Sequence, residues 1–179
     1  MTSENQDDNL HEFLILNWLD IDIIINRNQF FASVFLEEVD KYSSHAEYFS
    51  SLMKYHGDTL PVFDFNAFLK DTFRSGINSM FNIALICNVS LFSEENQTVY
   101  RNDILKENTD FSKDYLALKV TVQAGIKRVP LSEIRLIPLG LREKLHNEGF
   151  LGCRFTIENN IQYFVDIESI IFKSMQKKR

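Results

Sequence analysis

The stretch that decides the fold is Met-Lys-Tyr-His-Gly-Asp-Thr-Leu-Pro-Val-Phe-Asp-Phe-Asn-Ala-Phe, from Met53 to Phe68. It contains a Gly57-Asp58 turn, which is a signal for a tight connection between two strands. The β-rich residues Thr59–Phe63 follow this turn and predict a strand. Pro61 cannot donate a backbone hydrogen bond, so we expect this strand to be an edge strand or to bulge at the proline.

Asp64 follows the predicted strand and precedes an apolar run with helical spacing. An aspartate side chain accepts backbone N–H bonds at the start of a helix, so Asp64 is expected to cap a short helix over Phe65–Phe73. The same order recurs near the end of the chain, where Asp166 follows a strand and precedes Ile167–Met175. This repeat of strand and capped helix predicts two similar small β-barrels side by side.

The rest of the chain carries mostly strand signals. Leu10–Leu19 fits a strand and a short amphipathic helix equally well. Ile21–Ile25 and Phe30–Phe35 flank a polar turn and predict a hairpin. Further strands are expected at Phe81–Val89, Tyr115–Val122 and Ile126–Val129, a short helix within Leu139–Phe150, and a last hairpin from Cys153 to Val165. Ser90–Asp114 is polar and acidic, and we interpret it as a mobile or functional loop.

Composition places the chain among globular proteins, since 45% of the 179 residues are hydrophobic and 25% are charged. The net charge of -6 and the pI near 5.2 argue against a nucleic-acid partner or an anionic membrane surface. The basic cluster Lys173–Arg179 is interpreted as a frayed tail. The polar start of the chain and the lack of a long apolar run lead us to expect a cytoplasmic protein without membrane insertion.

No arrangement of residues points clearly to catalysis or to a metal. The four histidines have no metal-ligand spacing, and no phosphate-binding or nucleophile motif is found, so no metal or cofactor is expected. Cys87 and Cys153 lie in apolar stretches and are interpreted as buried thiols, with a disulfide as the alternative. His56 could act as a base with Asp58 or Asp64 in a small hydrolase, but a turn histidine and a helix cap explain the same residues.

The order and spacing of these segments resemble CheW-like chemotaxis coupling domains. In that family the turn reads Asn-Leu-Arg-Gly and is followed by Pro-Val-Ile-Asp-Leu; here Lys54–Gly57 precedes Pro61–Phe65, and His56 replaces the arginine. Leu36–Val39 is similar to the end of the family's second strand. The ending Val165–Ile171 is similar to its terminal Leu-Asp-Ile-x-x-Leu-Leu.

The resemblance implies a mainly β fold of two SH3-like five-stranded β-barrel subdomains with short helices and a C-terminal helix. On this basis the chain, 1–179, is one CheW-like domain. Its parts are an N-terminal extension (1–20), subdomains at about 21–81 and 82–172, an insertion loop (90–114) and the basic tail (173–179).

The resemblance also implies a non-enzymatic adaptor that links a CheA-type histidine kinase to the cytoplasmic tip of a chemoreceptor. The kinase-binding positions would be Leu36, Glu38 and Val39, and the receptor-binding positions His56, Gly57, Ile83 and Ala84. A CheW-like scaffold in another two-component or pilus-motility pathway is the alternative. A small hydrolase that uses His56 is a more remote one.

Overall fold

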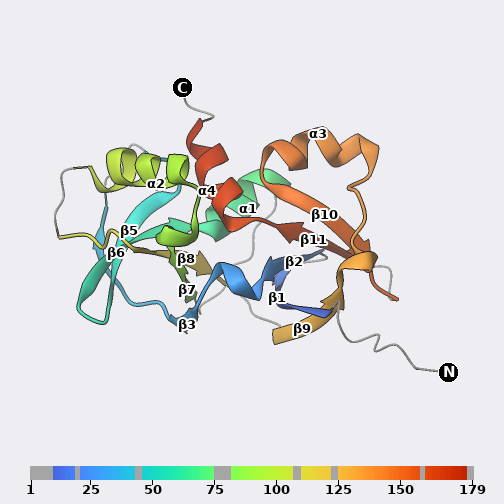
Figure 1. Cartoon of the computed structure of the whole chain (residues 1–179), viewed down its shortest axis with the longest axis horizontal. Helices are drawn as coiled ribbons and strands as arrows, with labels where there is room; N and C mark the ends of the chain where they lie inside the picture. Colours follow the sequence, from blue (N-terminus) through green and yellow to red (C-terminus); the bar gives the residue numbers. More distant parts are fainter. Residues whose placement is uncertain are drawn as a thin grey trace.

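The computed structural model describes residues 10–18, 21–42, 46–74, 82–106, 110–121, 125–157 and 160–176, without the side chains of Glu38, Val39, Ser50 and Gln176. Two mixed β-sheets lie side by side, and short helices and a C-terminal helix surround their junction (Figure 1). The predicted mainly β fold class is therefore confirmed.

The first sheet joins the two ends of the described chain. Its order is β10-β11-β2-β1-β9, and β11 runs parallel to β2. The chain that follows β9 reaches the opposite edge of the sheet, because the N–H of Arg135 donates to the carbonyl of Cys153 in β10 (2.7 Å) and the reverse bond is 2.9 Å. This bridge draws the sheet toward a closed barrel. The strands are β1 (Leu10–Trp18), β2 (Ile21–Asn26), β9 (Gly125–Pro130), β10 (Phe150–Phe155) and β11 (Ile161–Val165).

The second sheet has the order β3-β7-β8-β6-β5-β4, with β6 parallel to β8. Its two edge strands, β3 and β4, are separated in the chain only by Leu36 and Glu37, so this sheet also curves round on itself. The sheet has six described strands and not the expected five, because the second arm of the expected hairpin is divided into the two strands β3 and β4. The strands are β3 (Ala32–Phe35), β4 (Glu38–Lys41), β5 (Phe49–Tyr55), β6 (Asp58–Asp64), β7 (Ile83–Asn88) and β8 (Tyr115–Val120).

Among the described residues, alternating side chains of the strands divide the hydrophobic core into three clusters. One lies on one face of the first sheet and contains Phe13, Ile15, Ile24, Val129 and Phe164. A second lies on one face of the second sheet and contains Met53, Leu60, Val62, Ala84, Ile86 and Ala117. The opposite faces of both sheets contribute to the third and largest cluster, together with the helices. Period-two alternation along each strand thus supplies two barrel interiors and one shared seam.

Both predicted caps are present at the helices of this seam. Asp64 accepts a bond from the N–H of Ala67 (2.9 Å) at the start of α1 (Phe65–Phe73). Asp166 accepts one from the N–H of Ser169 (3.0 Å) at the start of α4 (Ile167–Gln176). Helix α4 extends through the first residues of the expected basic tail, and the Lys173 ammonium donates to the carbonyl of His146 (2.9 Å).

Three expectations for the N-terminal part are wrong. Residues 10–18 are not an extension but the strand β1, which lies between β2 and β9. Strands β2 and β3 do not form a hairpin, because the 3-10 turn Arg27–Gln29 carries the chain from the first sheet to the second. The boundary expected near residue 81 does not divide the sheets either, since the second sheet contains β3 to β8.

The segment 90–114 is also not an open loop over its described residues. It forms α2 (Glu94–Val99) and a π-helical turn (Tyr100–Leu105), and Tyr100 and Ile104 are fully buried in the seam. Glu168 at the start of α4 accepts bonds from the N–H of Ser93 (2.8 Å), its hydroxyl (2.7 Å) and the Asn96 amide (2.7 Å). The segment is therefore attached to the core by both apolar and polar contacts.

Pro61 does not lie on an edge strand, because β6 lies between β5 and β8. The ladder with β8 begins at Val62, one residue after the proline. Pro61 pairs with Leu52 of β5, and β5 has a bulge close to this pair, between Phe49 and Ser51. A proline is tolerated inside the sheet because the β8 ladder starts beyond it.

Candidate interaction surfaces

The corner between β3 and β4 contains the three residues expected to bind a kinase. Leu36 is half-buried and packs against the interior cluster of the second sheet, while its N–H donates to the carbonyl of Asn82 (3.2 Å). The backbone of Glu38 and Val39 lies in β4, with Glu38 opposite Met53; their side chains lie outside what the structure describes. Leu36 therefore contributes to the barrel interior more than to the surface.

Phe35 is the apolar residue that this corner exposes, and the sequence reasoning missed it. It is 78% exposed, and Glu37, two residues further along, is exposed as well. The signal was available, because β-strand alternation sends Phe35 to the face opposite Val34 and Leu36, which pack inward. The corner thus joins an exposed aromatic ring and an acidic side chain to an edge strand.

His56 and Gly57 form the tip of the β5–β6 hairpin. Both have positive φ, 48° for His56 and 95° for Gly57, as in the two-residue turns that match strand twist. His56 is exposed, and its ring meets that of Tyr55 edge-on with centroids 4.3 Å apart. Phe31 packs against Tyr55 and Tyr115 at this end of the sheet. The tip therefore presents a histidine next to a partly exposed aromatic group.

Ile83 and Ala84 do not share this location. Ala84 pairs with Lys119, which pairs with Asp64 at the far end of β6 from the hairpin. The seven residues of β6 correspond to roughly 20 Å along the strand. Ala84 is also fully buried, so its expected role as a direct receptor contact is wrong, whereas Ile83 is half-buried against the seam.

The register also separates the histidine from one of its proposed catalytic partners. Asp64 lies at the opposite end of β6 from His56, caps α1, and forms an ion pair with the Lys119 ammonium (3.4 Å). The pairing of His56 with Asp64 in a hydrolase is therefore wrong. Among the described residues, no group of three or more histidine, cysteine or acidic side chains could hold a metal ion.

Both cysteines are free and buried, as predicted. Burial raises the pKa of the Cys87 thiol to about 12, because an apolar surrounding disfavours the thiolate. Burial also raises the pKa of Cys153, although the nearby Arg135 acts in the opposite direction. The thiols therefore behave as packing groups at neutral pH and not as nucleophiles.

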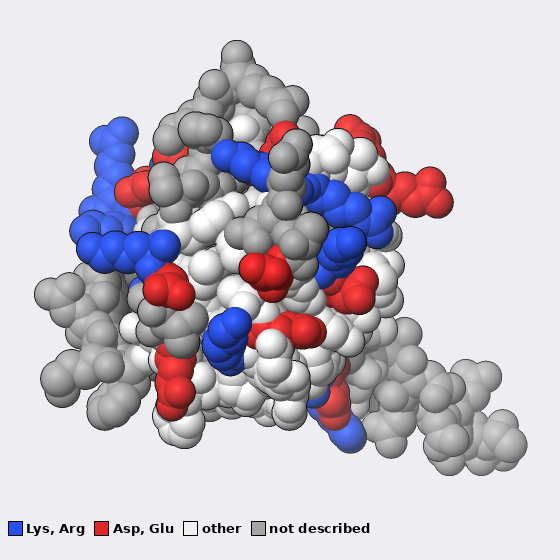
Figure 2. All heavy atoms as spheres, turned by 90° about the vertical axis from the view of Figure 1, so that its left-hand side faces the viewer, with Lys and Arg blue, Asp and Glu red and all other residues white. Residues whose placement is uncertain are grey.

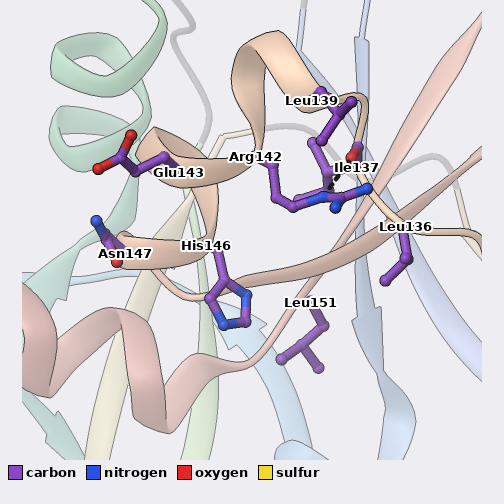
Figure 3. Close-up of a pocket in the computed structure, with 8 residues that line it drawn as sticks. All are labelled: Leu136, Ile137, Leu139, Arg142, Glu143, His146, Asn147 and Leu151. Carbon is purple, nitrogen blue, oxygen red and sulfur yellow. Dashed lines mark hydrogen bonds between the residues drawn. The ribbon is translucent and has the colours of Figure 1, made fainter.

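A groove of about 460 Å³ lies between α3 (Leu139–Asn147) and β10. Figure 3 shows leucine side chains from the segment before α3, from α3 itself and from β10 around the groove. Leu136, Leu139 and Leu151 are 73%, 80% and 56% exposed, whereas Ile137 is buried.

No described helix is long and apolar enough to cross a membrane.

Charges on the end of the molecule that carries the β5–β6 hairpin are mixed. Figure 2 shows basic and acidic side chains interspersed there among uncharged ones. A nucleic-acid surface needs basic side chains gathered in one patch. The charge distribution on this face is instead typical of a protein surface.

The comparisons with known proteins identify the fold. No protein-family model matches the sequence, and a search of curated proteins gives no significant match. Among solved structures, the crystal structure of the scaffolding protein TtCheW from Thermoanaerobacter tengcongensis is similar, with a TM-score of 0.61 and 10% identity. The likeness covers 93% of this chain and 91% of that one.

The chain has a CheW-like fold. The TtCheW likeness extends over nearly the whole chain, so both sheets fall within it. The CheW-like fold also agrees with the order of segments that the sequence resemblance used.

Proposed function

We propose that this chain is a non-enzymatic cytoplasmic adaptor that couples a CheA-type histidine kinase to chemoreceptors. The observation that carries the proposal is the likeness to a scaffolding protein over 93% of the chain. The order of strands, turn and capped helices supports it as well, because the sequence of these segments resembles CheW-like coupling domains.

The β3–β4 corner is the proposed kinase-binding surface. An interface of this kind needs an exposed apolar centre and a charge that sets the register. Phe35 supplies the apolar side chain, and the acidic residues that follow it supply the charge. Strand β4 is an edge of the described sheet, and an edge strand can align with a strand of a partner.

Charge reversal at Glu38 tests this surface. The regulatory domain of the CheA-type kinase from the same cell is titrated with wild type, Glu38→Arg and the control Glu95→Arg, whose position on α2 is exposed. Loss of an interfacial charge pair costs about 2 kcal/mol or more, so we expect Glu38→Arg to weaken binding about 30-fold or more. The control should bind like wild type, and all three should melt at similar temperatures.

The two failures of this titration have different meanings. Binding by wild type that Glu38→Arg leaves unchanged would reject the β3–β4 corner as the kinase surface. No binding by wild type would reject the kinase-coupling function itself.

The β5–β6 hairpin tip is the proposed receptor-binding surface. A histidine lacks the fixed fork of donors of a guanidinium, so the contact that His56 makes should be weaker than that of an arginine. We expect His56→Arg to tighten binding to a receptor-tip fragment, while a lysine-to-arginine change at exposed Lys70 has no effect. Equal affinities for wild type and His56→Arg would remove the hairpin tip from the receptor surface.

A further inference from the structure

The groove between α3 and β10 is separate from both surfaces proposed above. It lies on the first sheet, whereas the β3–β4 corner and the hairpin tip belong to the second (Figure 1). Its walls come from three places: the segment before α3, α3 itself and β10. The leucines at these places are each more than half exposed, although leucine is among the residues most often buried. An exposed apolar group of this kind marks a binding surface.

The charges around the groove are arranged by sign. The Arg142 side chain is half-buried, and its Nε donates to the carbonyl of Ile137 (3.0 Å). The guanidinium lies at the end near Leu136 and Leu139, whereas Glu143 and Asn147 lie at the other end (Figure 3). A ligand that fits must therefore be apolar in the middle and carry a carboxylate beside the guanidinium.

Strand β10 is not available to pair with an extended peptide. It pairs with β11 on one side, and on the other the two bonds between Arg135 and Cys153 occupy the middle of the strand, so an extended peptide cannot pair along its length. A partner must then dock through side chains alone. The form that presents apolar side chains on one face while satisfying its own backbone is an amphipathic helix.

We propose that this groove binds an amphipathic α-helix of a partner protein. The helix places leucine-like side chains from successive turns between Leu136, Leu139 and Leu151, and an acidic side chain against the Arg142 guanidinium. This inference rests on the adaptor function proposed above and gives the adaptor a third contact surface. The helix would belong to a component of the same signalling assembly.

Two synthetic peptides test the proposal. The first is a blocked helix of about five turns with leucine at i, i+4, i+7 and i+11, and glutamates beside the leucines at one end only, to match the single guanidinium of the groove. The second has lysine at every glutamate position. Each is titrated into the isotope-labelled full chain and followed by NMR. We expect saturable shifts at α3 and around Leu136 and Leu151 with the acidic peptide, and at least tenfold weaker binding of the lysine peptide.

Matched variants make the result specific to the groove. Leu139→Glu should weaken the acidic peptide tenfold or more, while Leu91→Glu, at a leucine that is 70% exposed elsewhere, should have no effect. Arg142→Glu should reverse the preference in favour of the lysine peptide. Melting curves show whether each variant keeps its fold, and Leu139 and Leu91 are exposed enough to be replaced without loss of core packing.

Several outcomes would overturn the proposal. These are no binding of the acidic peptide, equal binding of both peptides, or binding that Leu139→Glu leaves unchanged. Dimerisation of the chain that Leu139→Glu abolishes would assign the groove to a second copy, and vesicle binding with the same sensitivity would assign it to a lipid surface.

The peptide titration is independent of the kinase and receptor titrations. Peptide binding without kinase binding would reject the adaptor function and keep the groove as a helix-binding site. Kinase binding without peptide binding would reject only the groove.

Discussion

Replacing Tyr100 with alanine tests whether the helical segment at residues 93–105 belongs to the cooperative core. Tyr100 has no exposed surface and packs in the seam between the sheets. Its hydroxyl donates to the carbonyls of Ser112 (3.1 Å) and Tyr115 (2.8 Å), so it also ties the segment to β8. Burial raises the pKa of this phenol above its ordinary value, so it remains a neutral donor.

Two variants separate the contribution of the ring from that of the hydroxyl. Removal of a buried aromatic ring costs about 3–5 kcal/mol, so Tyr100→Ala should lose this much stability. Tyr100→Phe keeps the ring but leaves the two carbonyls without the hydroxyl, which costs about 1–2 kcal/mol. Each kcal/mol shifts the melting temperature of a chain of this size by about 2–4 °C. The expected decreases are therefore about 6–20 °C for alanine and about 2–8 °C for phenylalanine.

Chemical and thermal unfolding followed by circular dichroism measure these losses. Glu95→Ala is the control, because Glu95 is exposed on α2 and its removal should change stability by less than about 0.5 kcal/mol. If the free energy of unfolding of Tyr100→Ala lay within about 1 kcal/mol of the wild-type value, the segment would not be part of the core, and its attachment to the seam would be refuted.

Three further predictions concern other parts of the fold. Gly149→Ala should lose about 2–4 kcal/mol in urea unfolding, because its φ is 96° and an added Cβ would lie 2.8 Å from the backbone nitrogen of Ile170; wild-type stability would contradict this close approach. Asp166→Ala should lose about 1–2 kcal/mol and Asp166→Asn less, because the side chain caps α4 and accepts a bond from the Gln29 amide (2.7 Å); wild-type stability of Asp166→Ala would show that the cap is unimportant. Cys87 should resist iodoacetamide in the folded protein at pH 8 and react fully in guanidinium, because its thiolate forms only near the raised pKa of about 12. Rapid labelling of Cys87 in the native protein would contradict the burial of this thiol.

Local signals in the sequence were sufficient to predict several elements. Asp64 and Asp166 are predictable as caps because a helix start needs acceptors for its free N–H groups, and this need is independent of tertiary structure. Gly57 was assigned to a turn for the same kind of reason, since the turn requires positive φ. The strands before both caps followed from their β-branched and aromatic residues.

Elements defined by long-range pairing could not be predicted in the same way. The sequence of β1 is compatible with both a strand and a helix, because its apolar residues pack into two clusters on opposite faces of the sheet and so do not alternate with polar ones. The polar and acidic composition of Ser90–Asp114 predicts a loop, whereas the attachment of its helical part depends on Glu168, which is far away in the sequence. Ala84 was misplaced as a contact because burial follows from the sheet register.

A binding experiment with three components tests the central claim most directly. A receptor-tip fragment is immobilised, and retention of the CheA-type kinase is measured with and without this chain. An adaptor with two separate surfaces on the second sheet should retain the kinase only when the chain is present, and Glu38→Arg should abolish that retention while the chain itself still binds the receptor. Kinase retention that does not depend on the chain, or a chain that binds neither component, would contradict the adaptor function.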